Sequence, residues 1–531
     1  MLNKREIYFI LIALCFLLYA NSLNNAFISD DIAGIAKNPL ISSPLHFWLS
    51  PDSLLNSLNY LIAKFNPFIY HLTNIILHSL NTILVFLFLN LFFKTEASFL
   101  GACLFAAHPV HTEAVAWVSG RPYIITSIFI LCAYFLYSYA AAQSPGRHTP
   151  GLKLRAYCLC LLIFTYYVFR NFSFYFVFPF FLILADVTFN RWRKNWKLWI
   201  PFFIILILTL LYYRSIISHR ILSVAKDING GGKIIWTNPV YNFTYSFFSH
   251  MRLLLWPAKL TLYHEPAVIS SFALKAELVF LSLLIIALPF IFRKAKELFF
   301  GIGIFVLFLA PTYSPVMVSW LVAERYLYFP SIVLSIVLAF FYERIIVFAS
   351  RFKLHVSSFT LQPATCSLQR VARYCIIFII AALGVRTVAR NEDWKSPERF
   401  WRQTALVSPA SPRAHNNMGD VYAQEGNMEG AIREFKKAIE IKPDYADVYH
   451  NLANIYHHNG NFTEAIKFYK QAISFEPGLF ESHYNLGLIY LNNTRELDLA
   501  KIELARAVEL RPEDEAARAA LGLVMEKQTV K

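Results

Sequence analysis

The chain is short of charged residues and of cysteine. Only 16% of its 531 residues are charged, whereas 57% are hydrophobic, and the mean hydropathy is +0.45. A composition this apolar excludes an ordinary soluble fold and indicates a membrane protein. The seven cysteines lie in or beside apolar runs, and none follows Cys375. Their placement therefore excludes a disulfide framework and a zinc-binding spacing.

Acidic residues are scarce before Pro412. Residues 1–411 contain 35 Lys and Arg but 16 Asp and Glu, whereas the remainder contains 14 and 18. The basic residues of the first region form short clusters in every second connection between apolar runs. The positive-inside rule accounts for these clusters, which makes the connections cytoplasmic and leaves no need for a nucleic-acid partner.

Eleven apolar runs are predicted to cross a membrane as helices. A helix that spans the bilayer needs about 20 residues. The run 240–257 is interpreted instead as an interfacial amphipathic segment, because a twelfth span would move the later basic clusters outside. An odd number of spans, with the N-terminus inside, places everything after Asn391 on the non-cytoplasmic side. The predicted spans lie near 5–23, 71–93, 96–116, 122–142, 155–171, 172–189, 197–214, 273–292, 297–313, 326–347 and 374–390.

The C-terminal region repeats itself with a period of 34 residues. Small residues recur at Gly419, Ala453 and Gly487, aromatic, alanine and proline positions recur in the same register, and the third repeat has one extra residue before Ala500. This pattern is typical of tetratricopeptide repeats, which stack pairs of helices into an α-solenoid. The predicted fold class is therefore all-α, a polytopic membrane helix bundle followed by a solenoid. The predicted parts are a membrane domain over 1–390, a linker and half repeat over 391–411, three repeats over 412–514 and a capping helix over 515–531.

Two adjacent carboxylates, Asp30 and Asp31, follow the first predicted span. They are either merely solvated or functional. A carboxylate that is partly desolvated at the membrane boundary has a raised pKa and suits the role of a general base. Such a base would take the proton of a hydroxyl that attacks a sugar.

Polar residues also gather between the third and fourth spans, in AAHPVHTEAVAWVSGRPY. We interpret His108, His111 and Glu113 as pocket-lining groups, with a divalent cation as an alternative that Pro109 disfavours. The planar guanidinium of Arg121 suits an anionic leaving group, although an interfacial arginine is the plainer interpretation.

Two further polar groups belong to predicted spans or their ends. His78 belongs to a polar stripe with His71, Asn74 and Asn81, which either joins helices by hydrogen bonds or lines a lipid groove. Glu324 and Arg325 precede the tenth span and are interpreted as pocket and phosphate groups or, more simply, as an ion pair with each other.

Several stretches together resemble one family. In order they are SDDIAGIAKNP, YHLTNIILHSLN, HPVHTEAVAWVSGR, AERYLYFPS and RNEDWKSPERFWRQT, followed by the repeats. The chain is similar to the transmembrane and tetratricopeptide-repeat-containing O-mannosyltransferases and their bacterial relatives, which belong to the GT-C glycosyltransferases. The resemblance implies a polyprenyl- or dolichyl-phosphate sugar donor, an inverting transfer at the outer membrane face and a protein Ser or Thr acceptor.

Site roles follow from this resemblance. It implies that Asp30 is the catalytic base, Asp31 its acidic neighbour and Arg121 an arginine near the donor phosphate. Arg170 and Arg325 are further candidates for binding that phosphate. One alternative is a related transferase with a glycan or lipid acceptor, and another, from a different class, is a catalytically inactive membrane-anchored scaffold. A bacterial inner membrane is favoured over the endoplasmic reticulum.

The repeats carry one further candidate site. Asn417, Asn451 and Asn485 occupy the same register position and are expected to form a ladder along the concave surface. Since an amide offers both a donor and an acceptor, the ladder would hold the backbone of an acceptor peptide. In the alternative, each amide bonds a neighbouring helix.

Overall fold

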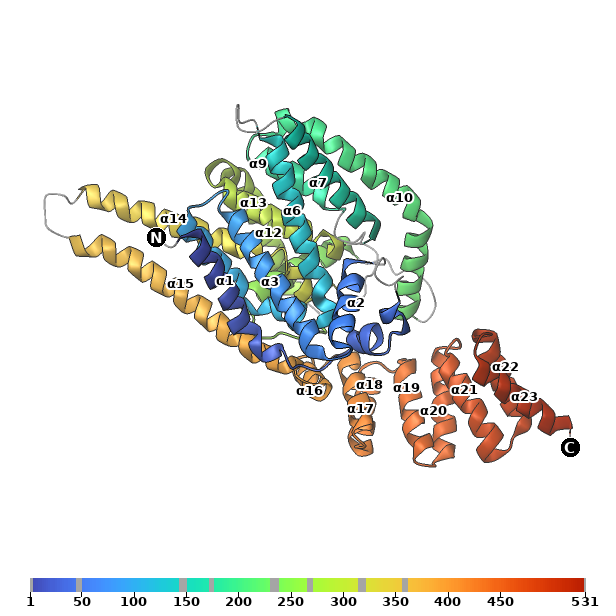
Figure 1. Ribbon diagram of the computed structural model, residues 1–531. Coiled ribbons are helices and arrows are strands. Elements are labelled where there is room, and N and C mark those ends of the chain that lie inside the picture. The colour runs from blue at the N-terminus through green and yellow to red at the C-terminus, as the bar shows by residue number, and fades with distance from the viewer. Residues whose placement is uncertain are drawn as a thin grey trace. The chain divides into compact units, whose positions relative to one another are not determined.

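The described part of the chain is helical throughout. The computed structural model describes residues 3–43, 50–142, 150–170, 176–229, 238–264, 271–313, 321–355 and 362–529. In these ranges the regular elements are helices and no strand is found, which confirms the all-α prediction. The chain divides into two compact units, and the boundary between the membrane-type helices and the repeats falls between Pro397 and Glu398 (Figure 1).

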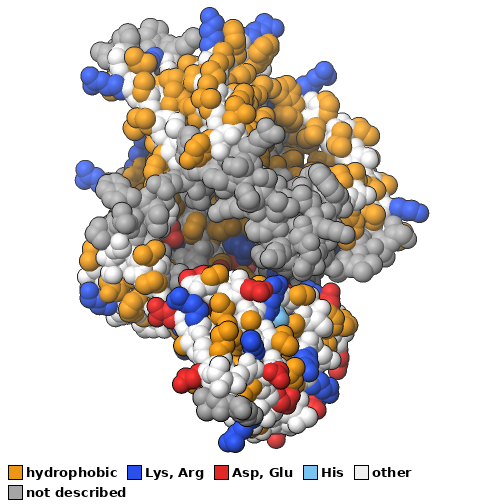
Figure 2. Space-filling view, turned by 90° about the vertical axis from the view of Figure 1, so that its right-hand side faces the viewer, with side chains coloured by type: hydrophobic (Ala, Val, Ile, Leu, Met, Phe, Trp, Pro, Cys, Tyr) orange, Lys and Arg blue, Asp and Glu red, His pale blue; other side chains and the backbone are white. Residues whose placement is uncertain are grey.

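The first unit is a bundle of membrane-type helices. Within the described ranges, eight helices are long and apolar enough to cross a membrane. They are α1 (Lys4–Tyr19), α3 (Pro67–Leu89), α6 (Arg121–Ala141), α7 (Pro150–Arg170), α10 (Trp192–Asn229), α12 (Ser271–Lys294), α14 (Ile332–His355) and α15 (Gln362–Asn391). Their outer faces expose large apolar side chains, such as Ile286 and Phe290 on α12, 74% and 67% exposed. On the face that Figure 2 shows, hydrophobic side chains dominate this unit, whereas acidic and basic ones mingle on the repeats.

Three predicted spans are shorter than expected. Their helices are α4 (Thr95–Ala107), α9 (Phe178–Thr188) and α13 (Lys296–Phe308), of 13, 11 and 13 residues. A helix of this length covers only part of a bilayer. In α4 the cause is Pro109, because the residue before a proline is driven out of the helical conformation, and His108 ends the helix with ψ 122°. The amphipathic segment forms α11 (Pro239–Leu255), which is not among the eight.

The first and last spans of the bundle are joined at one end. The side-chain amide of Asn391 donates to the carbonyl oxygen of Leu18 at 2.8 Å and to Asn21 Oδ1 at 2.9 Å. The backbone oxygen of Asn391 accepts from Asn25 Nδ2 at 3.3 Å. These bonds connect α1 to α15 across more than 360 residues of sequence.

The second unit consists of paired helices. Gly419 makes the first pair pack closely, because a Cβ there would lie 2.5 Å from the Phe435 ring. The extra residue of the third repeat is taken up by a π-helical turn over Tyr490–Thr494, which lengthens the helix without breaking it. The helices are α16 (Pro397–Val407), α17 (Pro412–Gln424), α18 (Met428–Ile441), α19 (Ala446–His458), α20 (Phe462–Phe475), α21 (Phe480–Ile489), α22 (Leu497–Leu510) and α23 (Glu515–Thr529).

Candidate active site

Two loops of the first unit are fastened together at the end of the bundle where α1 ends and α6 begins. Asp31 Oδ1 accepts from Ser119 Oγ at 2.5 Å and from Ser119 N at 2.8 Å. Asp31 Oδ2 accepts from Ile28 N at 3.3 Å, and Trp117 Nε1 donates to Ile28 O at 3.2 Å. The loop after α1 is therefore fixed to the loop before α6 by both its side chain and its backbone.

The two adjacent carboxylates face different surroundings. Asp31 is 1% exposed, and burial raises its pKa from 3.8 to about 6 although Ser119, Ile28 and Arg121 oppose the rise. Asp30 is exposed, and Ser29 Oγ lies 3.4 Å from its Oδ1. Ser29 adopts the left-handed conformation with φ 56°, which turns the chain just before the pair. A fixed backbone thus presents one carboxylate to solvent while its neighbour anchors the loop.

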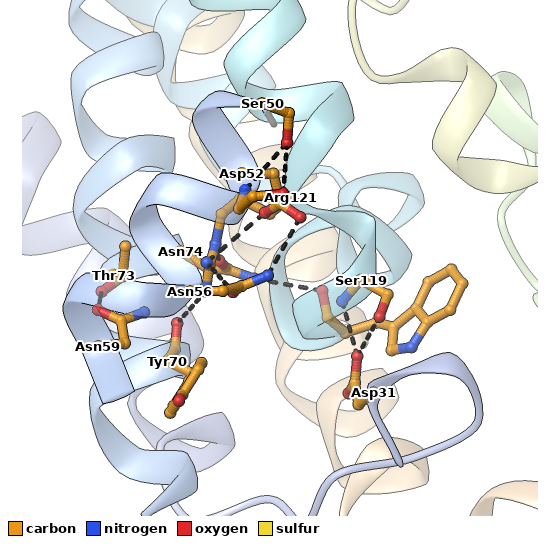
Figure 3. A network of polar contacts seen from close by, with 12 residues as sticks. Asp31, Ser50, Asp52, Asn56, Asn59, Tyr70, Thr73, Asn74, Ser119 and Arg121 are labelled. Atoms are coloured by element: carbon orange, nitrogen blue, oxygen red, sulfur yellow. Dashed lines mark hydrogen bonds and ion pairs between the residues drawn. The ribbon is translucent and has the colours of Figure 1, made fainter. Parts of the chain in front are cut away.

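Arg121 lies in a closed polar cage (Figure 3). Its Nε donates to Asn74 Oδ1 and its Nη1 to Asn56 Oδ1, both at 2.6 Å, and its Nη2 donates to the Tyr70 carbonyl oxygen at 3.1 Å. Asp52 is 3.6 Å from Nη1. The side chain is 0% exposed, and all three of its nitrogens are engaged. Arg121 therefore ties α6 to α3 and to α2 (Pro51–Ala63), a helix of the connection between α1 and α3.

Arg325 is the more accessible cation at this end. It forms an ion pair with Glu113, whose Oε2 also accepts from Arg325 N at 2.9 Å. Its guanidinium carbon lies 5.8 Å from the Trp117 ring centre and 5.1 Å from that of Tyr326, distances suited to cation–π attraction. Its side chain is 11% exposed, whereas that of Glu113 is fully buried. The pair joins the loop before α6 to the loop before α14.

Glu324 does not pair with its neighbour Arg325, so the interpretation of a self-contained ion pair is wrong. Its Oε1 lies 3.4 Å from Arg390 Nη2 and 3.6 Å from His264 Nε2. Arg390 also donates to Asp393 Oδ2 at 2.9 Å. A 3₁₀ turn over Glu324–Leu327 places the two neighbouring side chains in different directions. Arg390 is a site residue that the sequence analysis missed, although it opens the RNEDW stretch of the resemblance.

The three candidate histidines have separate partners. His78 Nδ1 lies 2.6 Å from Tyr328 Oη, His108 Nε2 lies 2.9 Å from the Leu254 carbonyl oxygen, and His111 Nε2 lies 2.8 Å from Ser331 Oγ. In the part of the chain that the structure describes, no three His, Cys, Asp or Glu side chains converge as metal ligands would.

The polar stripe of α3 joins helices to loops. His71 Nε2 lies 3.1 Å from the Asn25 carbonyl oxygen, and Asn74 Nδ2 donates to the carbonyl oxygens of Val115 and Trp117 at 3.0 and 3.2 Å. These contacts agree with the interpretation of the stripe as a helix-joining feature. The remaining candidate cation, Arg170, ends α7, and its side chain is outside the described part of the chain.

The repeat amides are half-buried and bond to the preceding repeat. Asn451 Nδ2 donates to Asn416 Oδ1 and Asp420 Oδ1, both at 3.0 Å, and Asn485 Nδ2 donates to Asn454 Oδ1 at 3.1 Å. Asn417 is half-buried on α17. Bonding of this kind between first helices was the alternative interpretation, and a role for the amides in peptide binding stays a prediction.

Known proteins resemble both parts of the chain. Family models for the TPR repeat match residues 419–460 and 453–493, and one for the tetratricopeptide repeat matches residues 480–514. The human protein O-mannosyl-transferase TMTC3 is 24% identical over 80% of this chain and 50% of its own length. The Caenorhabditis elegans protein O-mannosyl-transferase F38B6.6 is 26% identical over 82% and 63%.

One match covers a shorter part of the chain at a higher sequence identity. The Drosophila melanogaster protein O-mannosyl-transferase Tmtc1 is 37% identical over 24% of this chain and 17% of its own length. The chain spans about half the length of the human and mouse TMTC3 proteins. Over about four fifths of its length it is thus a homologue of proteins named protein O-mannosyl-transferases, and its C-terminal unit contains tetratricopeptide repeats.

Proposed function

We propose that the chain transfers a sugar, mannose or a close analogue, from a polyprenyl-phosphate carrier to Ser or Thr hydroxyls of an acceptor protein. The observation that carries this proposal is the exposed carboxylate of Asp30 on a loop that Asp31 fixes at one end of a membrane helix bundle. The names of the relatives agree with it, since a protein O-mannosyl-transferase needs a sugar donor and a protein acceptor.

Asp30 would act as the general base. It takes the proton of the acceptor hydroxyl while the oxygen forms a bond to the anomeric carbon. The bond between that carbon and the phosphate oxygen breaks on the opposite side, and its electron pair leaves with the phosphate. A single displacement of this kind inverts the configuration and needs no covalent intermediate.

The leaving phosphate requires a positive partner. Of the two candidate arginines whose side chains the structure describes, Arg325 is better placed for direct contact, because its side chain is 11% exposed whereas that of Arg121 is fully enclosed. We assign Arg121 a positioning role, since it holds α2, α3 and α6 together beside the Asp31 loop. The buried Glu113 orients Arg325 from behind.

An apolar pocket in the same unit fits the lipid part of the donor. It lies between α11, α12 and α13, has a volume of about 360 Å³, and is lined by side chains such as Phe247, Leu281 and Val306. An isoprenoid chain would bury its surface there without meeting a charged group. The pocket thus supports a lipid-linked donor over a soluble nucleotide sugar.

The basic clusters give the proposed orientation. They support an orientation with the N-terminus in the cytoplasm and the Asp30 loop and the repeats on the other side. We favour a bacterial inner membrane, with the endoplasmic reticulum as the alternative. Protease added to the non-cytoplasmic face of sealed vesicles should release the repeats, and protection of the repeats there would contradict this orientation.

Substitution of Asp30 by Asn tests the function directly. The change keeps the shape of the side chain and removes the base, so transfer from a radiolabelled polyprenyl-phosphate mannose to protein should be lost while the variant accumulates in membranes like the wild type. Wild-type transfer by the variant would overturn the assignment of Asp30.

A further inference from the structure

A pocket opens in the second unit between the first two repeats. It has a volume of about 390 Å³ and is formed by α17, α18 and α19. Its apolar lining is Ala423, Met428, Phe435 and Ile455, and its polar lining is Asp420, Gln424, Asn451, Asn454 and His458. We call this the repeat pocket. Its combination of an apolar lining and polar acceptors suits a long side chain with a polar end.

Among the residues that the structure describes, no positive partner is found for the carboxylate of Asp420 in this pocket. It is half-buried and accepts a hydrogen bond from Asn451 Nδ2 at 3.0 Å. Burial raises the pKa of Asp420 to about 7, and among the described residues the charged group that acts on it is Asp447, a second carboxylate, which raises it further. Burying a charged carboxylate without a counter-charge costs free energy. A positively charged ligand would supply that counter-charge.

Other carboxylates of the second unit have basic residues near them. Lys442 and Arg413 lower the pKa of Asp447 against the effect of burial. Glu481 forms an ion pair with Arg511 at 2.5 Å. Asp420 therefore differs from the acidic residues around it, and it is the one that lines the pocket.

One amide of the pocket, Asn451, adds a hydrogen-bond acceptor, whereas Asn454 Oδ1 already accepts from Tyr469 Oη and Asn485 Nδ2. Asn451 uses its NH₂ group for Asn416 and Asp420, so its carbonyl oxygen takes no part in those bonds. Arginine and lysine side chains offer several N–H donors and no acceptor. The acceptors of the pocket therefore match a basic side chain and would repel an acidic one.

We propose that the repeat pocket binds a lysine or arginine side chain of the acceptor peptide. The aliphatic part of that side chain lies against Phe435 and Ile455, and its charged end meets Asp420 and the Asn451 carbonyl oxygen. The proposal rests on the proposed transfer to a protein acceptor and adds a preference for basic residues near the modified Ser or Thr.

Binding of matched peptides to the full chain in detergent tests this proposal without any transfer reaction. Short fluorescent Ser- and Thr-rich peptides carry one central arginine or, as twins, citrulline, which keeps the shape and removes the charge. The wild type should bind the arginine peptides about tenfold more tightly, as expected of a charge-assisted hydrogen bond. Asp420→Asn should abolish this difference.

Two further variants complete the design. Asp498→Asn makes the same charge change on α22, away from the pocket, and should keep the preference for arginine. Ala423→Leu narrows the pocket without changing its charge and should weaken binding of the arginine peptides. Equal binding of both twins by the wild type, or a preference that survives in Asp420→Asn, would overturn the proposal. Failure of sugar transfer would leave these binding results unaffected and would count against the proposed function alone.

Discussion

Asp31 and Ser119 lie 88 positions apart in the sequence and share two hydrogen bonds, at 2.5 and 2.8 Å, that end on one carboxylate oxygen. The loop that carries Asp30 is therefore held in place by the turn that precedes α6. Asp31→Ala should lower both thermal stability and transfer activity, because the Ser119 donors lose their acceptor, at a cost of about 1–3 kcal/mol. Asp30→Asn should lower activity alone. Melting in detergent, measured beside transfer, separates the two, and equal melting of the Asp31 variant and the wild type would contradict the anchoring role.

The buried Asp31 should also make stability depend on pH. Its pKa is raised from 3.8 to about 6 by burial, so the folded state binds the proton more tightly than the unfolded state. Its contribution to stability is therefore greatest at low pH and falls as the pH rises from about 4 to 6, by at most about 3 kcal/mol. Asp31→Asn should remove this component. Melting temperatures of both proteins across that range test the prediction, which fails if the two pH profiles run parallel.

Substitutions of Glu113 and Arg325 should have effects on stability that depend on each other. Glu113→Gln leaves Arg325 without its counter-charge and should destabilise the fold by about 3–5 kcal/mol. Arg325→Met alone should also destabilise it, because the buried Glu113 charge is left unpaired. The double variant should be more stable than either single variant and yet inactive if Arg325 contacts the donor phosphate. Additive losses of stability would show that the two side chains do not depend on each other.

Close packing at Gly419 gives a prediction for the repeats. Gly419→Ala would place a Cβ 2.5 Å from the ring of Phe435, which is 1% exposed and has little room to move. We expect a loss of about 1–3 kcal/mol in the stability of the repeats. Gly522→Ala is the matched control, since no atom lies within 4 Å of the added carbon. Thermal melting followed by circular dichroism should distinguish the two, and equal melting would contradict the packing argument.

The repeats could be predicted from the sequence because the two helices of every repeat pack against each other in the same way. A small residue recurs wherever two helices cross, as at Gly419 and Gly487, so the period is visible without a structure. The spans were predictable for a similar reason, since a bilayer demands long apolar runs. The lengths of the helices were harder to predict from the sequence. Pro109 ends α4 after Ala107, and hydropathy alone does not detect the effect of a proline on the preceding helix.

The contacts of the candidate site could not be predicted in the same way. Arg121 depends on Asn56 and Asp52 of α2, a helix in a loop that no span pattern marks. Arg325 has Glu324 beside it in the sequence, but its partner is Glu113, 212 positions away. Adjacent charges suggest a pair, whereas the turn at this point separates them. The sequence indicated which residue types gather at the site, and the fold decides which of them meet.

The bonds of Asn391 to Leu18 and Asn21 also bear on how the protein is made. A ribosome synthesises α1 long before α15, so the connection that secures the C-terminal end of α1 forms only after Asn391 has been translated, more than 360 residues later. Until then the Asp30 loop lacks one of its supports. The proposed catalytic centre is therefore incomplete during insertion, and a nascent chain that stalls before Asn391 should lack the connection between α1 and α15.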